Sequence, residues 1–207
     1  MDRSNLELLT QQILERLFVP VAASGRHVHM TTEQAQRLFG HGLTPERPLS
    51  QPGQFLSRER VTVVGPKGRF ENVAVLGPER KEAQLEISLT DGRTLGLQPP
   101  IKLSGRTDGT PGATLQGPKG TVELDRGVLV AQRHIHLTPA DGERFRVKDG
   151  QMVRLRVFSR RPVIFEDVIV RISPDFQSAA HLDFDEANAC GYEKGDFGRI
   201  EPCAGPC

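Results

Sequence analysis

The sequence lacks several features that would assign it to a common class of protein. Its 207 residues include no tryptophan and one tyrosine, and 27 basic and 26 acidic side chains leave a net charge of only +1. No apolar run approaches the roughly 20 residues of a membrane-spanning helix, and the first residues do not follow the basic-then-apolar order of a secretory signal. The balanced charge offers no broad basic face for nucleic acid. We therefore expect a cytoplasmic protein that binds neither membranes nor nucleic acid.

Cysteines are scarce and confined to one end of the chain. The three cysteines, Cys190, Cys203 and Cys207, all lie close to the C-terminus, whereas a disulfide framework uses an even number spread along the sequence. We interpret Cys203 and Cys207 as parts of an unimportant tail, with pairing between them as the alternative. No cysteine lies in a pattern typical of a catalytic nucleophile.

The most informative feature that is present is a repeated hexapeptide. Its two copies, one in each half of the chain, are Arg26-His27-Val28-His29-Met30-Thr31 and Arg133-His134-Ile135-His136-Leu137-Thr138. Residues i and i+2 of a β-strand face the same side, so each His-x-His presents two imidazoles together. A single such pair is more often a packing or surface feature than a ligand pair. Because the pair recurs, and imidazole is a common ligand of zinc, the repeat predicts two metal sites in related halves.

A metal site of this kind needs further ligands from elsewhere in the chain. Catalytic metals usually have three protein ligands, and His181 is the candidate for the second copy, since His41 follows a helix-ending glycine and is expected in a loop. For the first copy the candidates are strand carboxylates such as Glu86, although such a residue more often faces solvent. Arg80, in a basic turn, suits a phosphate. Spacing alone does not select Glu86 or Arg80.

The hydrophobic pattern predicts a mainly β fold of two small β-barrel domains with short capping helices. An amphipathic helix is expected over residues 4–18, and we interpret it as packed on its own domain, with docking to a partner or shell as the alternative. Helices with N-terminal caps follow both hexapeptides, at residues 31–40 and 138–145. Many short strands separated by Gly and Pro favour barrels over a doubly wound sheet. Extended segments are expected at residues 19–30, 61–64, 73–76, 121–124, 128–137, 152–158, 162–172 and 198–201.

A set of separate motifs, in order from about residue 19 to residue 201, closely resembles the PduL-type phosphotransacylases, also called phosphate propanoyltransferases. Because several motifs occur in the same order, the resemblance is specific. The motifs are Ser24-Gly25-Arg26-His27-Val28-His29, Gly65-Pro66-Lys67-Gly68, Val75-Leu76-Gly77-Pro78-Glu79-Arg80, Gln84-Leu85-Glu86-Ile87-Ser88-Leu89-Thr90-Asp91, Gly109-Thr110-Pro111-Gly112, Arg133-His134-Ile135-His136-Leu137-Thr138 and Ser173-Pro174-Asp175-Phe176.

The resemblance implies the domain organisation and the site residues. The N-terminal helix, residues 1–18, would precede a discontinuous first barrel of residues 19–26 and 132–207 and a second barrel of residues 27–131. A dinuclear zinc site, with two ions per chain, and a phosphate-binding catalytic arginine are implied. The zinc ligands would be His27, His29 and Glu86 for one ion and His134, His136 and His181 for the other. The phosphate-binding arginine would be Arg80. The residues that contact coenzyme A would be Ala23, Ser24, Gly25, Lys67 and Asn188.

Two positions depart from the family pattern. Gly25 stands where the family usually has asparagine, and Ala74 stands where it has arginine. Both departures concern the binding of the nucleotide rather than the metal ligands.

The activity implied by the resemblance is reversible transfer of a short acyl group, propanoyl or acetyl, between coenzyme A and inorganic phosphate. Acyl-CoA, phosphate and acyl phosphate would be the reactants, with coenzyme A as substrate or product. Because the sequence has neither a well-placed cysteine nor a Gly-x-Ser-x-Gly motif, we predict direct attack by metal-bound phosphate rather than a covalent acyl-enzyme. A homo-oligomer is expected on general grounds, and the N-terminal helix is a candidate contact for a bacterial microcompartment. The alternatives are a zinc-dependent acyl-CoA thioester hydrolase and a non-catalytic microcompartment scaffold.

Overall fold

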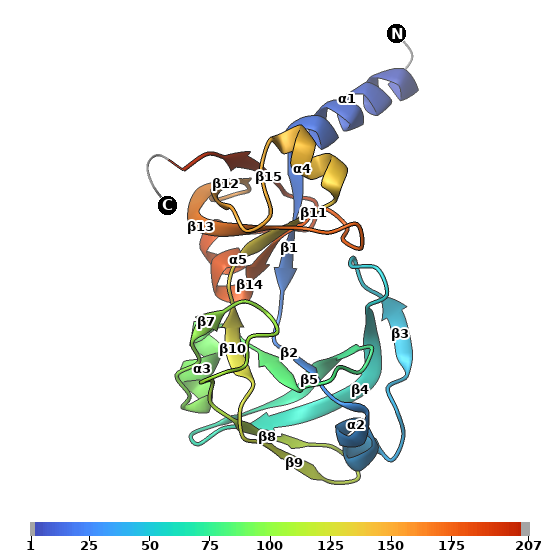
Figure 1. The fold of residues 1–207 in the computed structure, drawn as a ribbon, viewed down its shortest axis with the longest axis vertical. Helices are drawn as coiled ribbons and strands as arrows, with labels where there is room; N and C mark the ends of the chain where they lie inside the picture. The colour runs from blue at the N-terminus through green and yellow to red at the C-terminus, as the bar shows by residue number, and fades with distance from the viewer. Residues whose placement is uncertain (1–2, 204–207) are drawn as a thin grey trace. The chain divides into compact units, whose positions relative to one another are not determined.

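The computed structural model of the protein describes residues 3–203 and divides the chain into two compact units. Unit 1 comprises Met1–Ser24, Arg133–Leu182 and Glu186–Cys207, and unit 2 comprises Gly25–Gln132 and Asp183–Asp185. The chain passes from unit 1 to unit 2, and later back, shortly before the two histidine pairs. The fold is mainly β, as predicted, with one closed barrel and one half-barrel sheet (Figure 1).

Unit 1 is the closed barrel, with the strand order β1-β14-β11-β13-β12-β15. Pairing of β1 with β15, which aligns Val19 with Gly198, closes it. Its apolar core includes Ile135, Leu155 and Val170, which are fully buried. The strands are β1 (Val19–Ser24), β11 (His134–Leu137), β12 (Met152–Phe158), β13 (Val163–Ile172), β14 (Ala179–Asp183) and β15 (Phe197–Glu201), and the helices are α1 (Arg3–Leu17), α4 (Pro139–Phe145) and α5 (Phe184–Cys190).

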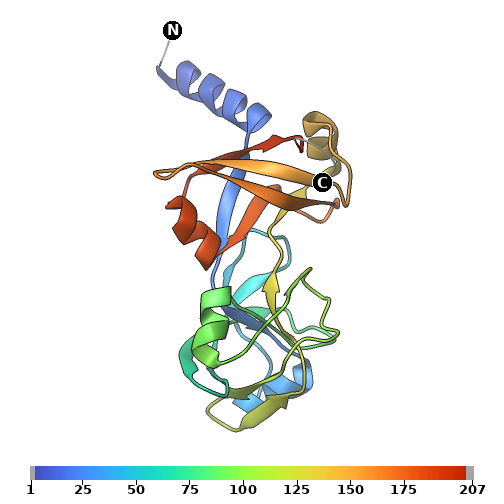
Figure 2. The ribbon, with the colours of Figure 1, turned by 90° about the vertical axis from the view of Figure 1, so that its left-hand side faces the viewer.

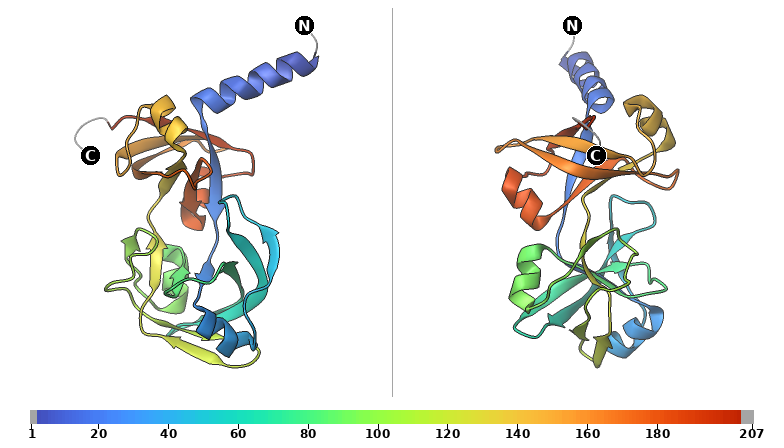
Figure 3. Two further views of the ribbon diagram at one scale, coloured as in Figure 1. Left: turned by 45° about the vertical axis from the view of Figure 1, so that its right-hand side comes forward. Right: turned by 60° about the vertical axis from the view of Figure 1, so that its left-hand side comes forward.

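Unit 2 is built on a nine-stranded sheet of order β7-β10-β6-β2-β5-β4-β8-β9, with β3 paired to β4. Its core includes Val28, Val75 and Leu85, which come from the three adjacent strands β2, β5 and β6. Figure 3 shows the curved sheet from two further sides. The strands are β2 (His27–His29), β3 (Pro45–Pro48), β4 (Phe55–Val64), β5 (Arg69–Gly77), β6 (Gln84–Glu86), β7 (Ile101–Lys102), β8 (Ala113–Gln116), β9 (Thr121–Leu124) and β10 (Val128–Ala131), and the helices are α2 (Thr32–Phe39) and α3 (Leu89–Leu95).

The two hexapeptides occupy the same topological place in their units. In unit 2, β2 lies between a parallel neighbour, β5, and an antiparallel neighbour, β6. In unit 1, β11 lies between the parallel strand β13 and the antiparallel strand β14. A helix follows each hexapeptide, and its first turn is capped by the threonine that ends the motif, Thr31 or Thr138. A further short helix, α3 or α5, follows each antiparallel strand, so the internal repeat is much longer than the hexapeptide itself.

Local sequence signals predicted several elements correctly. The strands expected at residues 121–124 and 152–158 have those limits, and α2 is bounded by Thr31 and by Gly40, whose φ of 81° lies in the left-handed region that glycine adopts readily. The prediction of one strand over residues 128–137 is wrong, because β10 pairs with β6 and β7 whereas β11 pairs with β13 and β14. The segment expected over residues 19–30 is likewise divided into β1 and β2.

Helix α1 forms where it was predicted, but its interpretation as a packed helix is wrong. Leu8 is 58% exposed and Leu17 is 53% exposed, and Leu9 and Ile13 are also exposed. In Figure 2 the helix extends away from the barrel of its unit. The next residue, Phe18, contacts the barrel, with its ring 4.8 Å from that of Phe197 between centroids.

The described helices include none that is both long and apolar enough to span a membrane. Of the three cysteines, Cys190 is buried and free. The prediction about Cys203 and Cys207 is only partly covered, because Cys207 lies outside the described residues.

Candidate metal and phosphate sites

In unit 2 the first histidine pair meets Glu86. One ligand atom from each of His27, His29 and Glu86 lies within 4.8 Å of the others. The cause is strand register: β2 and β6 are antiparallel, and His27 stands directly opposite Glu86. Directly opposed residues in an antiparallel pair project to the same face of the sheet. The distance from His27 Nε2 to Glu86 Oε2 is 3.6 Å, close enough for a shared ion between them.

Both histidines of this group are oriented by backbone carbonyl groups. His27 Nδ1 lies 2.8 Å from the carbonyl oxygen of Gly25, and His29 Nδ1 lies 3.2 Å from that of Leu76. Because a carbonyl oxygen only accepts, each Nδ1 must carry the hydrogen and donate it. When such a ring is neutral, its lone pair is then on Nε2, which is the arrangement found in histidines that bind metals.

The positive charge of Arg80 acts on this group. It follows β5 in a loop, and its backbone N–H donates to the carbonyl oxygen of Met30, 2.8 Å away, at the end of the hexapeptide strand. Burial, followed by the charges of His27 and Arg80, holds the pKa of His29 well below 6.5. Burial also lowers the pKa of Arg80, while the carboxylate of Glu86 opposes that shift. At neutral pH His29 is therefore neutral, and the half-buried, cationic Arg80 is close enough for its charge to act on His29 and Glu86.

Unit 1 contains the second group, His134, His136 and His181, whose ligand atoms again lie within 4.8 Å of one another. The register that selects the third member is the same, because His134 stands opposite His181 in the antiparallel pair β11–β14. Burial is the main cause of a pKa of about 2 for His136 and about 3 for His181, with neighbouring positive charge as a smaller cause. Both rings are therefore neutral, as metal ligands must be.

His136 gives the most direct sign that the unit-1 group is built for a ligand. Among the described residues, both of its ring nitrogens are buried and have no hydrogen-bond partner. Its ring instead stacks on Phe176 at 4.0 Å between centroids. Leaving a buried polar atom unpaired costs about 1–3 kcal/mol. A metal ion bound to one nitrogen would remove part of that cost, so the residues present fit a zinc ion.

The residues expected to contact coenzyme A fall in both units. Ala23 and Ser24 end β1, and Asn188 is exposed on α5, in unit 1. Gly25 and the exposed turn residue Lys67 belong to unit 2. Their role in binding stays a prediction.

The structure gives a physical reason for one of the two departures from the family pattern. A Cβ atom at Gly25 would lie 2.7 Å from the ring of Phe184, so a larger residue there requires this ring to move.

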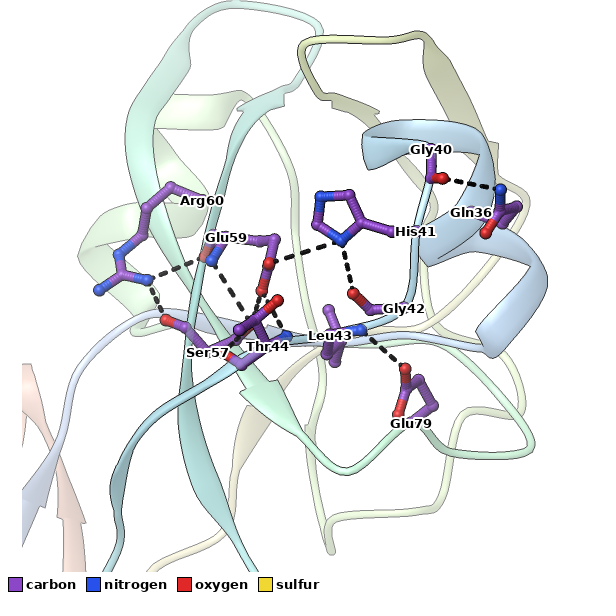
Figure 4. A network of polar contacts seen from close by, with 10 residues as sticks. All are labelled: Gln36, Gly40, His41, Gly42, Leu43, Thr44, Ser57, Glu59, Arg60 and Glu79. Atoms are coloured by element: carbon purple, nitrogen blue, oxygen red, sulfur yellow. Dashed lines mark hydrogen bonds and ion pairs between the residues drawn. The ribbon is translucent and has the colours of Figure 1, made fainter.

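His41 is not a member of either group, in line with its predicted loop position. It is exposed, and its Nδ1 lies 3.7 Å from a carboxylate oxygen of Glu59. Figure 4 shows the surrounding network, in which the partly buried Glu59 accepts hydrogen bonds from the Ser57 hydroxyl and the Thr44 backbone N–H. Burial opposes ionisation of Glu59, but these hydrogen bonds outweigh it and lower its pKa.

Two polar residues beside Glu86 were missed by sequence reasoning. Gln84 and Ser104 both donate hydrogen bonds to Oε1 of Glu86. Gln84 is two positions before Glu86 on β6, so the alternation of side chains along a strand could have identified it. Ser104 lies in a later loop, well separated from Glu86 along the chain, and no sequence signal connects them.

Comparison with known proteins identifies the family of the chain. The family model described as phosphate propanoyltransferase matches residues 20–193. A phosphate propanoyltransferase of Clostridioides difficile is 51% identical over 197 residues, covering 94% of each chain. Those of Thermotoga maritima and Salmonella typhimurium are 50% and 43% identical and cover 86% and 92% of this chain. The match spans both hexapeptides and all six candidate ligands, and the chain belongs to the phosphate propanoyltransferase family.

Proposed function

We propose that the protein is a phosphotransacylase that transfers a propanoyl or acetyl group reversibly between coenzyme A and inorganic phosphate. The observation that carries the proposal is the pair of three-residue ligand groups, one of which has the cationic Arg80 beside it. Family membership supports the reaction, since the relatives are named phosphate propanoyltransferases.

We further propose that the two groups hold one zinc ion each and serve a single reaction as a dinuclear centre. His27, His29 and Glu86 would hold one ion, and the three histidines of unit 1 would hold the other. Zinc supplies a Lewis acid that neutralises charge on phosphate and on the thioester oxygen. The repeated hexapeptide, the neutral histidines and the unpaired nitrogens of His136 support this assignment.

The side chains of the protein position and neutralise the substrate. Arg80 would hold the phosphate through the paired N–H groups of its guanidinium, in a half-buried place where charge is weakly screened. A phosphate oxygen would then attack the thioester carbonyl carbon, the carbon–sulfur bond would break, and coenzyme A would leave as a thiolate. The buried thiol Cys190 does not suit covalent catalysis, because burial raises its pKa.

The test is product analysis with the zinc-loaded, full-length protein and propanoyl-CoA. We expect release of coenzyme A to require phosphate and to yield one propanoyl phosphate for each coenzyme A released. Release of coenzyme A at the same rate without phosphate would instead identify a thioester hydrolase. A trapped acyl-enzyme would contradict direct attack without contradicting the overall reaction.

We also propose that α1 binds a partner protein in a microcompartment. The apolar side chains of Leu8, Leu9, Ile13 and Leu17 support this, because all four are exposed on one helix. Removal of residues 1–17 should leave the specific activity unchanged and abolish recruitment to a purified microcompartment shell. Unchanged recruitment would contradict the proposal.

A further inference from the structure

Hydrogen bonds from two side chains occupy one carboxylate oxygen of Glu86 and leave the other oxygen available to a metal ion. Oε1 accepts from the side-chain amide of Gln84 and from the hydroxyl of Ser104, the latter at 2.9 Å. The Gln84 amide also donates to the Ser104 oxygen at 2.9 Å. Two donors therefore occupy Oε1, whereas Oε2 is the atom that faces His27 Nε2.

The orientation of Gln84 is fixed by a further contact on its other side. The backbone N–H of Gly105 donates to Oε1 of Gln84 at 2.7 Å, so that oxygen must face Gly105 and the NH₂ group must face Glu86. Exchanging the amide oxygen and nitrogen would place an oxygen against the carboxylate and lose these hydrogen bonds. Gln84 is only 2% exposed, so water does not readily replace the lost bonds.

We propose that Gln84 and Ser104 are positioning residues that make Glu86 a metal ligand through one oxygen only. This inference rests on the proposed metal site at His27, His29 and Glu86. A carboxylate that binds through both oxygens would have to give up two hydrogen bonds on Oε1, in a place where Gln84 cannot rebond to solvent. Binding through one oxygen leaves an additional coordination position open at this ion, which suits a site that must also receive phosphate.

The unit-1 group serves as an internal control for this inference. Its three ligands are all histidines, and neither Gln84 nor Ser104 belongs to unit 1. A change at Ser104 should therefore alter one of the two metal sites and leave the other unaffected.

The experiment compares Ser104→Ala, Ser104→Thr and the wild type as full-length proteins. Each protein is stripped of metal and titrated with zinc against a chelator, and separately with Co²⁺, whose visible spectrum reports coordination. Outer hydrogen-bond partners typically contribute about 10- to 100-fold to metal affinity. Ser104→Ala should therefore bind one of its two ions about 10- to 100-fold more weakly and with an altered Co²⁺ spectrum, while Ser104→Thr, which retains the hydroxyl, should resemble the wild type.

Ser57→Ala is a matched control. Ser57 is a fully buried serine of the same unit, and it also donates to a partly buried carboxylate, that of Glu59 (Figure 4). We expect this variant to retain both metal affinities. If Ser104→Ala does not fold, Gln84→Met replaces it, since it removes the amide at similar volume and leaves the Ser104 hydrogen bond in place.

Unchanged affinity and an unchanged Co²⁺ spectrum in a folded Ser104→Ala or Gln84→Met protein would overturn the inference. An equal loss in Ser57→Ala would overturn it as well, because the effect would then be structural. Failure of the proposed metal site would give a different result from failure of this inference. In that case the wild type and Glu86→Ala would bind the same number of ions, because no metal site would depend on Glu86.

Discussion

The two histidine groups start from the same hexapeptide and differ in almost everything around it. In unit 2 the third member is a carboxylate, both histidines donate to backbone carbonyl groups, and Arg80 adds a positive charge. In unit 1 the third member is a histidine, and His136 lies against the ring of Phe176 instead of making a hydrogen bond. The unit-2 group thus combines a carboxylate with a nearby arginine, whereas the unit-1 group is made of histidines, one of which packs against an aromatic ring.

This difference shows which parts of a repeated site tolerate change. Both copies retain the strand between a parallel and an antiparallel neighbour, because that placement brings the third side chain opposite the first histidine. The identity of that third side chain differs between the copies, since Glu86 and His181 occupy the corresponding places. We infer that unit 2 is specialised for the anionic substrate, because Arg80 is in unit 2.

The largest expected effect on activity comes from removing a ligand of either metal group. Glu86→Ala and His136→Ala should each reduce phosphate-dependent consumption of propanoyl-CoA below detection, because the account assigns both ions to one reaction. Metal analysis should show about one ion retained per chain in each variant. Substantial activity in either variant would mean that the two groups act independently.

Removal of Arg80 should have the next largest effect. Arg80→Ala is expected to lower kcat/KM for phosphate on the order of 100- to 1000-fold, the usual cost of losing one group that stabilises charge in a reaction. Arg80→Lys should recover only part of the rate, since lysine cannot form a paired contact. Arg126→Ala, which removes a half-exposed arginine paired with Glu82, is the matched control and should leave the rate unchanged. An effect on propanoyl-CoA alone would contradict the assignment of Arg80 to phosphate.

The neutral histidines of unit 1 should contribute to the pH dependence of folding, together with His29 of unit 2, whose pKa burial also lowers. The pKa values of His136 and His181 in the folded state, about 2 and about 3, lie below the ordinary value of 6.5. Between about pH 3 and pH 6.5 the unfolded chain therefore binds more protons than the folded protein does. The free energy of unfolding decreases as the pH falls through this range. The slope is at most about 1.4 kcal/mol per pH unit for each histidine.

This dependence is measured by denaturant unfolding of the metal-free protein at several pH values. The double variant His136→Phe, His181→Phe should show a flatter profile, because it removes both groups. A steeper or unchanged profile would contradict the assignment of the dependence to these histidines.

A smaller difference is expected in how firmly the two groups hold zinc. The carboxylate of Glu86 adds negative charge to the unit-2 group, whereas the unit-1 ligands are all histidines, so the unit-1 group should release zinc first. Partial treatment of the protein with a chelator should leave about one ion per chain. In the single-site variants, Glu86→Ala should then bind its remaining ion about 10-fold more weakly than His136→Ala binds its own. If His136→Ala instead bound its remaining ion more weakly than Glu86→Ala, the charge of Glu86 and the hydrogen bonds to the unit-2 ligands would not govern zinc affinity.

Parts of the site were predictable because they depend on near neighbours in the sequence. The His-x-His pairs follow from strand alternation, and the caps of α2 and α4 follow from Thr31 and Thr138. Spacing could not select Glu86, because its place opposite His27 depends on the register of two strands that lie far apart in the sequence. The resemblance to a known family supplied that residue, and the structure supplies the reason for it.

Other features were missed because they depend on long-range packing. The break between β10 and β11 has no turn signal, since it marks the passage of the chain between two units. The apolar pattern of α1 predicted the helix but not its exposure, because an amphipathic pattern does not specify which surface covers it. Ser104 was missed because its contact with Glu86 comes from a loop.

The most direct test of the central claim is the amount of acyl phosphate formed by metal-loaded and metal-stripped protein from propanoyl-CoA. With zinc and phosphate present, we predict one propanoyl phosphate for each coenzyme A released, no release without phosphate, and recovery of the stripped protein when zinc is restored. Full activity in protein shown to be free of metal, or release of coenzyme A that does not depend on phosphate, would contradict the account.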